Sequence, residues 1–215
     1  MIDSYNKLTI GKFIELQDMD YTGMSEIDIQ VKIISILAEM DETDVMDLPL
    51  PEYKELASAT RFLSTPPKYE AKLPKKIVID GKEFDVISDV KKMTAGQYID
   101  YQTYIGMKDN KYLPHILSCF IIPKGEKYGE TKLEDIIQLF TDKLNILYAL
   151  SISAFFLHKW QSLTKATLRY LTWKMKRMKR KEKNQEVKEK IEKAISLLNT
   201  IKNGVGLDWL LELKK

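Results

Sequence analysis

Apolar residues recur every three to four positions along most of the chain, and this period predicts α-helices rather than strands. In "SEIDIQVKIISILAEM" (25–40) one helical face would consist of Ile27, Val31, Ile34 and Leu37. The segment "KYLPHILSCFII" (111–122) is similarly rich in apolar residues, and Pro114 suits the first turn of a helix. Thr131 and Glu134 have the spacing of a capping box, which predicts a further helix start.

The C-terminal half is expected to be almost continuously helical. Residues 133–160, "LEDIIQLFTDKLNILYALSISAFFLHKW", are apolar enough to form one central core helix. Beyond them the apolar residues become sparse, and a new helical stripe runs from Val187 until Gly204 interrupts it. The apolar segment around Trp209 would dock on the core of the protein or on a partner.

A phrase of ten residues occurs twice, as "LTIGKFIELQ" at 8–17 and as "MTAGQYIDYQ" at 93–102. In both copies a threonine precedes the helical pattern, where its hydroxyl can accept from the unpaired N–H groups of the first turn. Gln97 would complete a capping box with Thr94, whereas Thr9 would cap its helix alone. The phrase therefore predicts two helix starts of the same kind.

Each copy also has a glycine two residues after the threonine, Gly11 and Gly96. Glycine is costly inside a helix, so its recurrence predicts that both helices pack closely against a neighbouring segment. Downstream, "ETDVMDL" parallels "LEDIIQL", and both would open a further helix. We therefore expect two diverged copies of a three-helix unit, the alternative being that unrelated helices use the same capping residues.

Between the two copies the pattern changes from helical to extended. The linker "STPPKYEAKLP" contains three prolines and cannot continue a helix. In "KKIVIDGKEFDVI" the dipeptide Asp80-Gly81 predicts a type I′ turn and hence a β-hairpin, which should lie on helices or pair with another chain. The expected fold is thus mainly α: two diverged helical units joined by a short β-hairpin, followed by long C-terminal helices. The predicted domains are an acidic helical unit at 1–63, a linker with the hairpin at 64–92, a second helical unit at 93–160 and a basic extension at 161–215.

Charge is distributed unevenly, although the whole chain has a net charge of only +3. Residues 1–56 contain thirteen acidic and four basic residues, whereas residues 160–190 contain eleven basic and three acidic ones. The two regions should therefore attract each other or attract different partners.

Residues that could carry catalysis or bind a metal do not occur in a recognised arrangement. The two histidines, His115 and His158, are far apart in the sequence, and Cys119 is the only cysteine, which fits a reducing compartment. Neither a phosphate-binding glycine loop nor a Gly-x-Ser-x-Gly motif occurs. We therefore expect no enzymatic activity, no cofactor and no metal, unless distant residues converge.

A membrane location is not expected. The N-terminus has no basic leader followed by an apolar run, so a secretory signal is not predicted. The longest apolar stretch, residues 144–157, is fourteen residues long, which is shorter than the roughly 18–20 needed to cross a bilayer.

The basic run "WKMKRMKRKEK" contains seven Lys or Arg residues within positions 174–183. This charge density could bind phosphates, and Trp173 could stack on a base. A helix that faces solvent or contacts protein is the alternative, because these bases would surround the helix rather than line one groove. The candidate residues for contact with a partner or with nucleic acid are Lys174, Lys176, Arg177, Lys179, Arg180, Lys181 and Trp209.

Three segments resemble tailed-bacteriophage proteins of the tail-assembly-chaperone-like group, including proteins of Bacteroides-type phages. They are "KLTIGKFIELQDM", "DIQVKIISILAEMDETDVMDLPLPEY" and "VIDGKEFDVISDVKKMTAGQYIDYQTYI". The resemblance covers roughly residues 5–140, and neither the basic run nor the apolar C-terminus belongs to it.

The resemblance implies a non-enzymatic morphogenesis protein that acts by protein–protein contact in the host cytoplasm. Its partners would be phage structural proteins or further copies of this chain. The residues Thr9, Gly11, Thr94, Gly96 and Gln97 would then organise the fold rather than touch the partner. One alternative is a permanent minor component of the virion, in the neck, the tail or the capsid interior. A second is a nucleic-acid-associated protein that uses the basic helix at 174–183.

Overall fold

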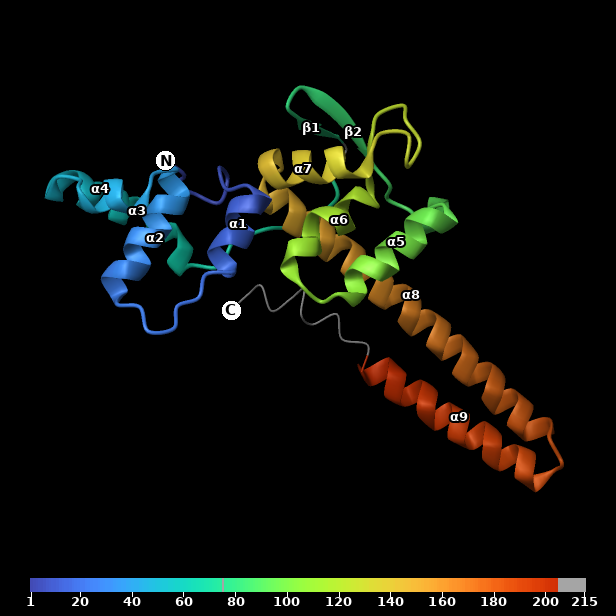
Figure 1. Cartoon of the computed structure of the whole chain (residues 1–215). Helices are drawn as coiled ribbons and strands as arrows, with labels where there is room; N and C mark the ends of the chain where they lie inside the picture. Colours follow the sequence, from blue (N-terminus) through green and yellow to red (C-terminus); the bar gives the residue numbers. More distant parts are fainter. Residues whose placement is uncertain (75, 205–215) are drawn as a thin grey trace. The chain divides into compact units, whose positions relative to one another are not determined.

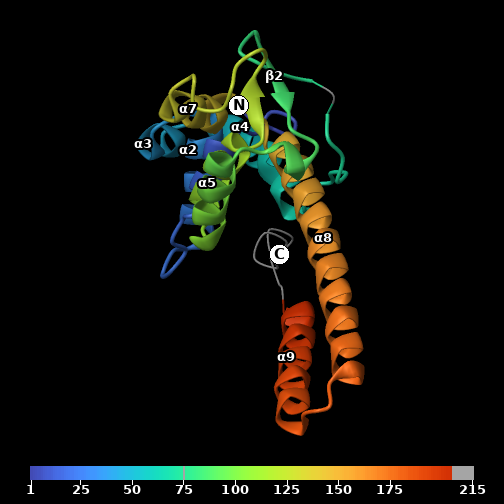
Figure 2. The same cartoon turned by 90° about the vertical axis from the view of Figure 1, so that its right-hand side faces the viewer.

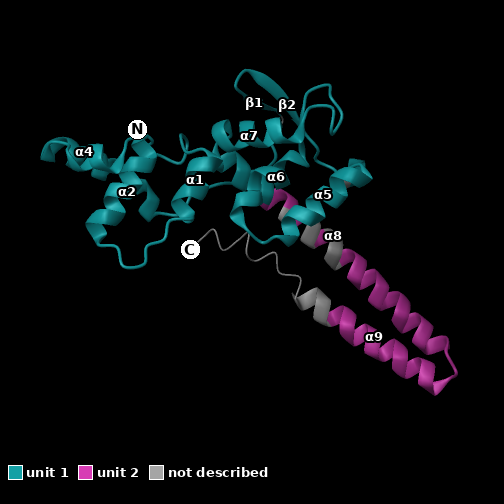
Figure 3. Cartoon of the chain, viewed as in Figure 1, with its two compact units in different colours: residues 1–153, 214–215 teal, residues 154–213 magenta. Residues whose placement is uncertain are grey.

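The computed structural model describes residues 1–74 and 76–204. They form two compact units, of which the first ends at Ser153 and the second begins at Ala154 (Figure 3). The four domains predicted from the sequence stay a prediction. The expected mainly α-helical fold with a short β-hairpin and long C-terminal helices is confirmed (Figure 1). The segment around Trp209 lies outside the described residues.

The first unit combines short helices with one small sheet. Its elements are α1 (Ile10–Gln17), α2 (Glu26–Ala38), α3 (Glu42–Met46), α4 (Leu50–Ala59), β1 (Ile77–Ile79), β2 (Lys82–Val86), α5 (Ala95–Gly106), α6 (Leu113–Ser118), β3 (Ile121–Pro123) and α7 (Leu133–Lys143). Helix α8 (Ile146–Lys181) begins in this unit and continues into the second, where α9 (Gln185–Gly204) follows it.

The repeated phrase starts a helix at both places, as predicted. The Thr9 side chain accepts from the N–H of Lys12 at the start of α1, and Thr94 forms the predicted capping box with Gln97 at the start of α5. The surroundings of the two copies nevertheless differ. Phe13 in α1 is buried, whereas the corresponding Tyr98 in α5 is 43% exposed. A duplication of the whole three-helix unit stays a prediction.

The two glycines of the phrase also differ in their surroundings. A Cβ added to Gly11 would lie 2.9 Å from the main-chain oxygen of Thr141, so α1 does pack closely against α7. A Cβ added to Gly96 would meet nothing nearer than the hydroxyl of Thr94, at 3.9 Å. The prediction of close packing is therefore correct for Gly11 and wrong for Gly96.

Helix α2 supplies a separate small core in the N-terminal part of the first unit. Val31 and Ile34 are buried there together with Val45 of α3, and side chains of α4 pack against them. Ile27 was expected on the same face but is 70% exposed. It lies in the first turn of α2, and the residues of α2 that belong to this core begin at Val31.

The predicted hairpin is present and is extended by a third strand. Asp80 and Gly81 both have positive φ, as a type I′ turn requires, and β3 adds to the other side of β2 in an antiparallel sheet of order β1-β2-β3. Ile121 and Ile122 were expected to be helical, but α6 ends at Ser118 and they pair with β2 as part of β3. Phe84 of β2 packs against Phe140 of α7, so the sheet does lie on a helix.

The expected single core helix over residues 133–160 is interrupted at Leu144 and Asn145, which separate α7 from α8. The N–H of Ile10 donates to the carbonyl of Leu144, and the N–H of Ile146 donates to the carbonyl of Leu8. These bonds form a short bridge to the segment before α1 that a continuous helix could not make. A long-range contact therefore overrides the local helical pattern here.

Helix α7 starts without the predicted capping box. Its N-cap residue is Lys132, which makes no side-chain capping bond. The Thr131 hydroxyl bonds the carboxylate of Glu126 instead, within the preceding turn. The capping-box prediction for Thr131 and Glu134 is therefore wrong, although a helix does begin there.

Candidate functional site

The described part of the second unit is a hairpin in which α8 and α9 run antiparallel and side by side (Figures 1 and 2). Its turn is held by two side chains. The Glu182 carboxylate accepts from the N–H groups of Lys183 and Asn184, which lowers the pKa of Glu182, and the Asn184 side chain accepts from the N–H of Glu186. The turn is thus determined by local hydrogen bonds.

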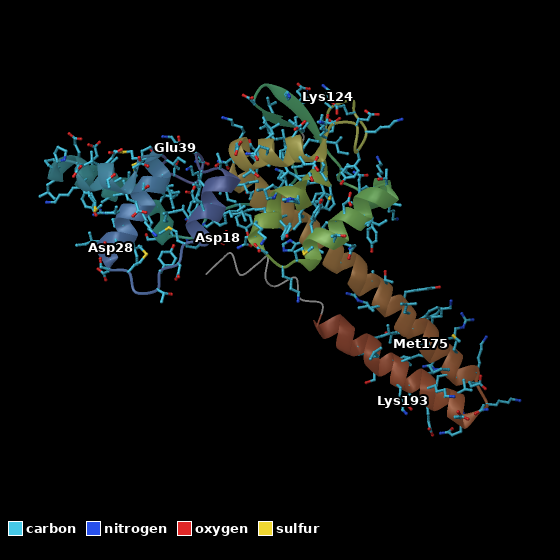
Figure 4. All side chains as sticks on the ribbon, viewed as in Figure 1. Asp18, Asp28, Glu39, Lys124, Met175 and Lys193 are labelled. Atoms are coloured by element: carbon cyan, nitrogen blue, oxygen red, sulfur yellow. The ribbon has the colours of Figure 1, made fainter. Side chains whose placement is uncertain are left out.

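The two helices meet along a narrow seam. Side chains removed from solvent recur at alternating spacings of four and three, the pattern of an antiparallel coiled coil. They include Leu168, Thr172, Met175 and Lys179 on α8 and Ile191, Ile195 and Leu198 on α9. Leu168 is buried, whereas the others are half-buried, so one layer of two helices does not enclose a full core. Figure 4, with Met175 of α8 and Lys193 of α9 labelled, shows the side chains along both helices.

Lys179 contributes to the seam rather than to an open surface. Its Nζ lies 2.6 Å from Oε1 of Glu192 on α9, so this predicted contact residue forms an ion pair within the hairpin. The other predicted contact residues that the structure describes are all exposed: Lys174, Lys176, Arg177, Arg180 and Lys181. Five of the six described candidates therefore remain accessible to a partner.

One flank of the hairpin contains an open pocket of about 300 Å³. Its lining consists of Arg169, Thr172, Trp173 and Lys176 from α8 and Asn199 from α9. The site thus combines two cations, an indole ring, a hydroxyl and an amide, and none of the described lining residues carries a carboxylate. Such a group of side chains favours an anionic ligand with a flat or apolar portion.

Trp173 also belongs to the outer face of α8, next to the pocket. Its ring is 56% exposed and lies 6.1 Å from the ring of Tyr170, centroid to centroid. The guanidinium carbon of Arg177 lies 5.6 Å from the same indole ring. Residues Tyr170, Trp173 and Arg177, one turn apart, therefore form an exposed aromatic and basic strip.

Three residues of the pocket were missed by the sequence reasoning. Arg169 and Thr172 lie before the dense basic run, but Arg169 is one helical turn before Trp173 and two before Lys176, a spacing that could have identified it. Asn199 comes from α9, and no local pattern links it to α8. Of the bases in the run at 174–183, only Lys176 lines the pocket, and its second cation, Arg169, comes from before the run.

The opposite flank of the hairpin is apolar. Leu171 and Met178 are seven residues apart on α8 and share a face, which helical geometry places on the side away from Arg169 and Lys176. By the same geometry Leu197 of α9 lies on that side, away from Asn199. Met178 is 52% and Leu197 is 64% exposed, so apolar side chains are left in contact with water. We refer to Leu171, Met178 and Leu197 as the apolar flank.

Among the predicted fold-organising residues, Gln97 does more than the sequence indicated. Its Oε1 accepts from the N–H of Thr94 at 2.8 Å, and its Nε2 donates to the carbonyl of Cys119 at 3.1 Å. The side chain is almost completely buried. It therefore joins the start of α5 to the end of α6 as well as completing the cap.

The histidines and the cysteine do not form a reactive site in the described residues. His158 is exposed, whereas His115 packs against the rings of Tyr104 and Tyr112, and burial lowers its pKa. Cys119 is buried, and desolvation raises the pKa of its thiol to about 12. In the part of the chain that the structure describes, no group of three or more His, Cys, Asp and Glu residues could hold a metal ion.

We expect Cys119 to be unreactive towards DTNB at pH 8 in the folded protein. The thiolate is the reactive form, and the raised pKa keeps its population small at pH 8. Burial of Cys119 also prevents the reagent from reaching the sulfur. Because the chain has one cysteine, absorbance at 412 nm reports on this thiol alone. The unfolded protein in guanidinium chloride should react fully and serves as the control. Rapid labelling without denaturant would contradict the buried placement.

Within residues 1–74 and 76–204, no helix is both long enough and apolar enough to cross a membrane. No family model matches the chain, and neither a curated protein nor a solved structure matches it.

Proposed function

We propose that this protein is a non-enzymatic bacteriophage morphogenesis protein that acts by protein–protein contact, like the tail-assembly-chaperone-like proteins that it resembles. The observation that supports the proposal most strongly is the apolar flank of the α8–α9 hairpin. The resemblance covers roughly residues 5–140, and the flank adds a surface outside that range that a client protein could cover.

Among the described residues of the second unit, two helices form a single layer, so their exposed apolar side chains would gain from a partner. Burying a Leu or Met side chain stabilises an association by about 1.5–3 kcal/mol before the costs of binding. Leu171, Met178 and Leu197 are apolar side chains of the kind that an amphipathic helix would cover. The partner that we propose is such a helix from a phage structural protein.

The strand edges of the first unit are a weaker candidate for the contact. Strand β2 is paired on both sides, and β1, the outer strand of the predicted hairpin, is three residues long. A strand this short offers few main-chain groups to an added strand. The apolar flank of the α8–α9 hairpin is therefore the better supported contact surface.

Affinity capture tests the proposed contact. The tagged full-length chain is expected to retain a phage structural protein from infected cells, and Leu171→Ser/Met178→Ser/Leu197→Ser should reduce its recovery at least tenfold, because exposed polar groups replace the apolar flank. Val78→Ser, at an exposed apolar position in β1, is the matched control and should leave recovery unchanged. Circular dichroism checks that the triple variant keeps its helices.

Two results would contradict the proposal. One is capture that includes no phage structural protein, and the other is equal recovery with the triple variant and the control. Mass spectrometry of purified particles then separates the two versions of the function. Presence of the chain would favour a permanent minor virion component, and its absence would favour a protein that acts only during assembly in the host cytoplasm.

A further inference from the structure

The pocket flank of the hairpin is a surface distinct from the apolar flank. We propose that it binds single-stranded nucleic acid, with Arg169 and Lys176 contacting phosphates and Trp173 stacking on a base. This activity is additional to the protein contact proposed above, because it uses the other side of α8.

The charge of α8 favours a polyanion. No Asp or Glu occurs from Lys143 to Lys181, and nine Lys or Arg residues occur between positions 159 and 181. Two of the three acids of α9 are paired with a cation: Glu192 with Lys179, and Glu186 with Lys190 on its own helix, at 2.6 Å. Phosphates that contact Arg169 and Lys176 would release condensed counterions, so binding should weaken with salt.

The aromatic side chains distinguish a strand with unpaired bases from other polyanions. Tyr170 and Trp173 expose their rings one turn apart, and Trp173 also lines the pocket between the two cations. Proteins that bind single strands without sequence preference combine basic grooves with such stacking platforms. In a duplex the base faces are covered by their neighbours, so a single strand fits this surface better.

The other residues of the pocket agree with this ligand. Thr172 and Asn199 supply a hydroxyl and an amide next to the cations, where they can bond a phosphate or a base edge. A volume of about 300 Å³ suits one unit of a polymer rather than a folded partner. A membrane surface would require bulky apolar side chains here, and those lie on the apolar flank instead.

Fluorescence anisotropy of a labelled 20-nucleotide oligo(dT) with the full-length chain tests the proposal. Binding is expected at 50 mM salt and should weaken at least tenfold at 200 mM. Arg169→Glu/Lys176→Glu should weaken it at least tenfold, because two phosphates lose their partners. Lys190→Glu/Lys193→Glu makes the same charge change on exposed positions of α9 and should have less than a threefold effect.

A second set of variants tests the stacking separately from the charge. Trp173→Leu should weaken binding about tenfold at unchanged salt dependence, and Trp173→Phe should restore most of the affinity. The triple variant of the apolar flank should bind oligo(dT) normally, so failure of the client contact and failure of this proposal are distinguishable. Circular dichroism checks that each variant remains helical.

Three outcomes would overturn the proposal. If oligo(dT) does not bind at 50 mM salt, the protein does not bind single-stranded nucleic acid at this surface. An equal loss for the α9 control variant means that net charge alone attracts the oligonucleotide. Displacement by poly-glutamate at equal charge, together with full binding by Trp173→Leu, would instead identify the surface as a site for acidic proteins.

Discussion

Replacing Asn145 by alanine is expected to lower the free energy of unfolding by about 3 kcal/mol. The Nδ2 group of Asn145 donates to the carbonyls of Tyr5 and Asn6, at 3.0 and 2.6 Å, and its Oδ1 accepts from the N–H of Leu147 at 2.8 Å. The side chain therefore caps α8 and also fastens the N-terminal segment to the break between α7 and α8. Urea unfolding followed by far-UV circular dichroism measures the effect.

Two further variants separate the contributions of Asn145. Asn145→Ser keeps an acceptor for the cap but loses the amide group that donates to Tyr5 and Asn6. It should therefore lower the free energy of unfolding by about 1 kcal/mol less than the alanine variant does. Asn6→Ala keeps the main-chain carbonyl that Asn145 uses and should change stability by less than about 0.5 kcal/mol. If Asn145→Ala lowered the free energy of unfolding no more than Asn6→Ala does, the Asn145 side chain would not hold the N-terminal segment in place.

Alanine at the two glycines of the repeated phrase should change stability in opposite directions. Gly11→Ala is expected to destabilise the protein by about 2 kcal/mol, because the new Cβ would lie 2.9 Å from the main-chain oxygen of Thr141, which cannot move without shifting α7. Gly96→Ala is expected to stabilise it by about 0.5–1 kcal/mol, since nothing obstructs the Cβ and alanine favours a helix.

Each glycine variant serves as the control for the other, because both change the same residue at the same place in the phrase. Urea unfolding of the two variants in parallel measures the difference in sign. Stabilisation by both would mean that α1 does not pack closely on α7. Destabilisation by both would mean that Gly96 has a neighbour that opposes a side chain.

The sequence was sufficient to predict those elements whose stabilising interactions lie within a few residues of one another. The threonine caps of α1 and α5 could be read from the sequence, because a hydroxyl three residues before a free N–H needs no distant partner. The same holds for the Asp80-Gly81 turn, whose positive φ values depend on the two residues themselves.

The candidate site could be predicted only in part. The basic run and Trp173 were visible in the sequence, and five of the six described candidates are exposed. The ion pair of Lys179 with Glu192 and the place of Asn199 in the pocket depend on how α9 lies beside α8. Such contacts between residues far apart in the sequence produce no repeating pattern by which they could be predicted.

Thus the sequence by itself determined the helical class, the two helix starts, the hairpin turn and the basic character of α8. Only the tertiary structure decided where α7 ends, that residues 121–123 form a strand, and that Gly11 but not Gly96 meets a neighbour. The physical reason is that caps and turns are satisfied within a few residues. Main-chain groups at the ends of elements, by contrast, bond whichever distant segment packing brings to them.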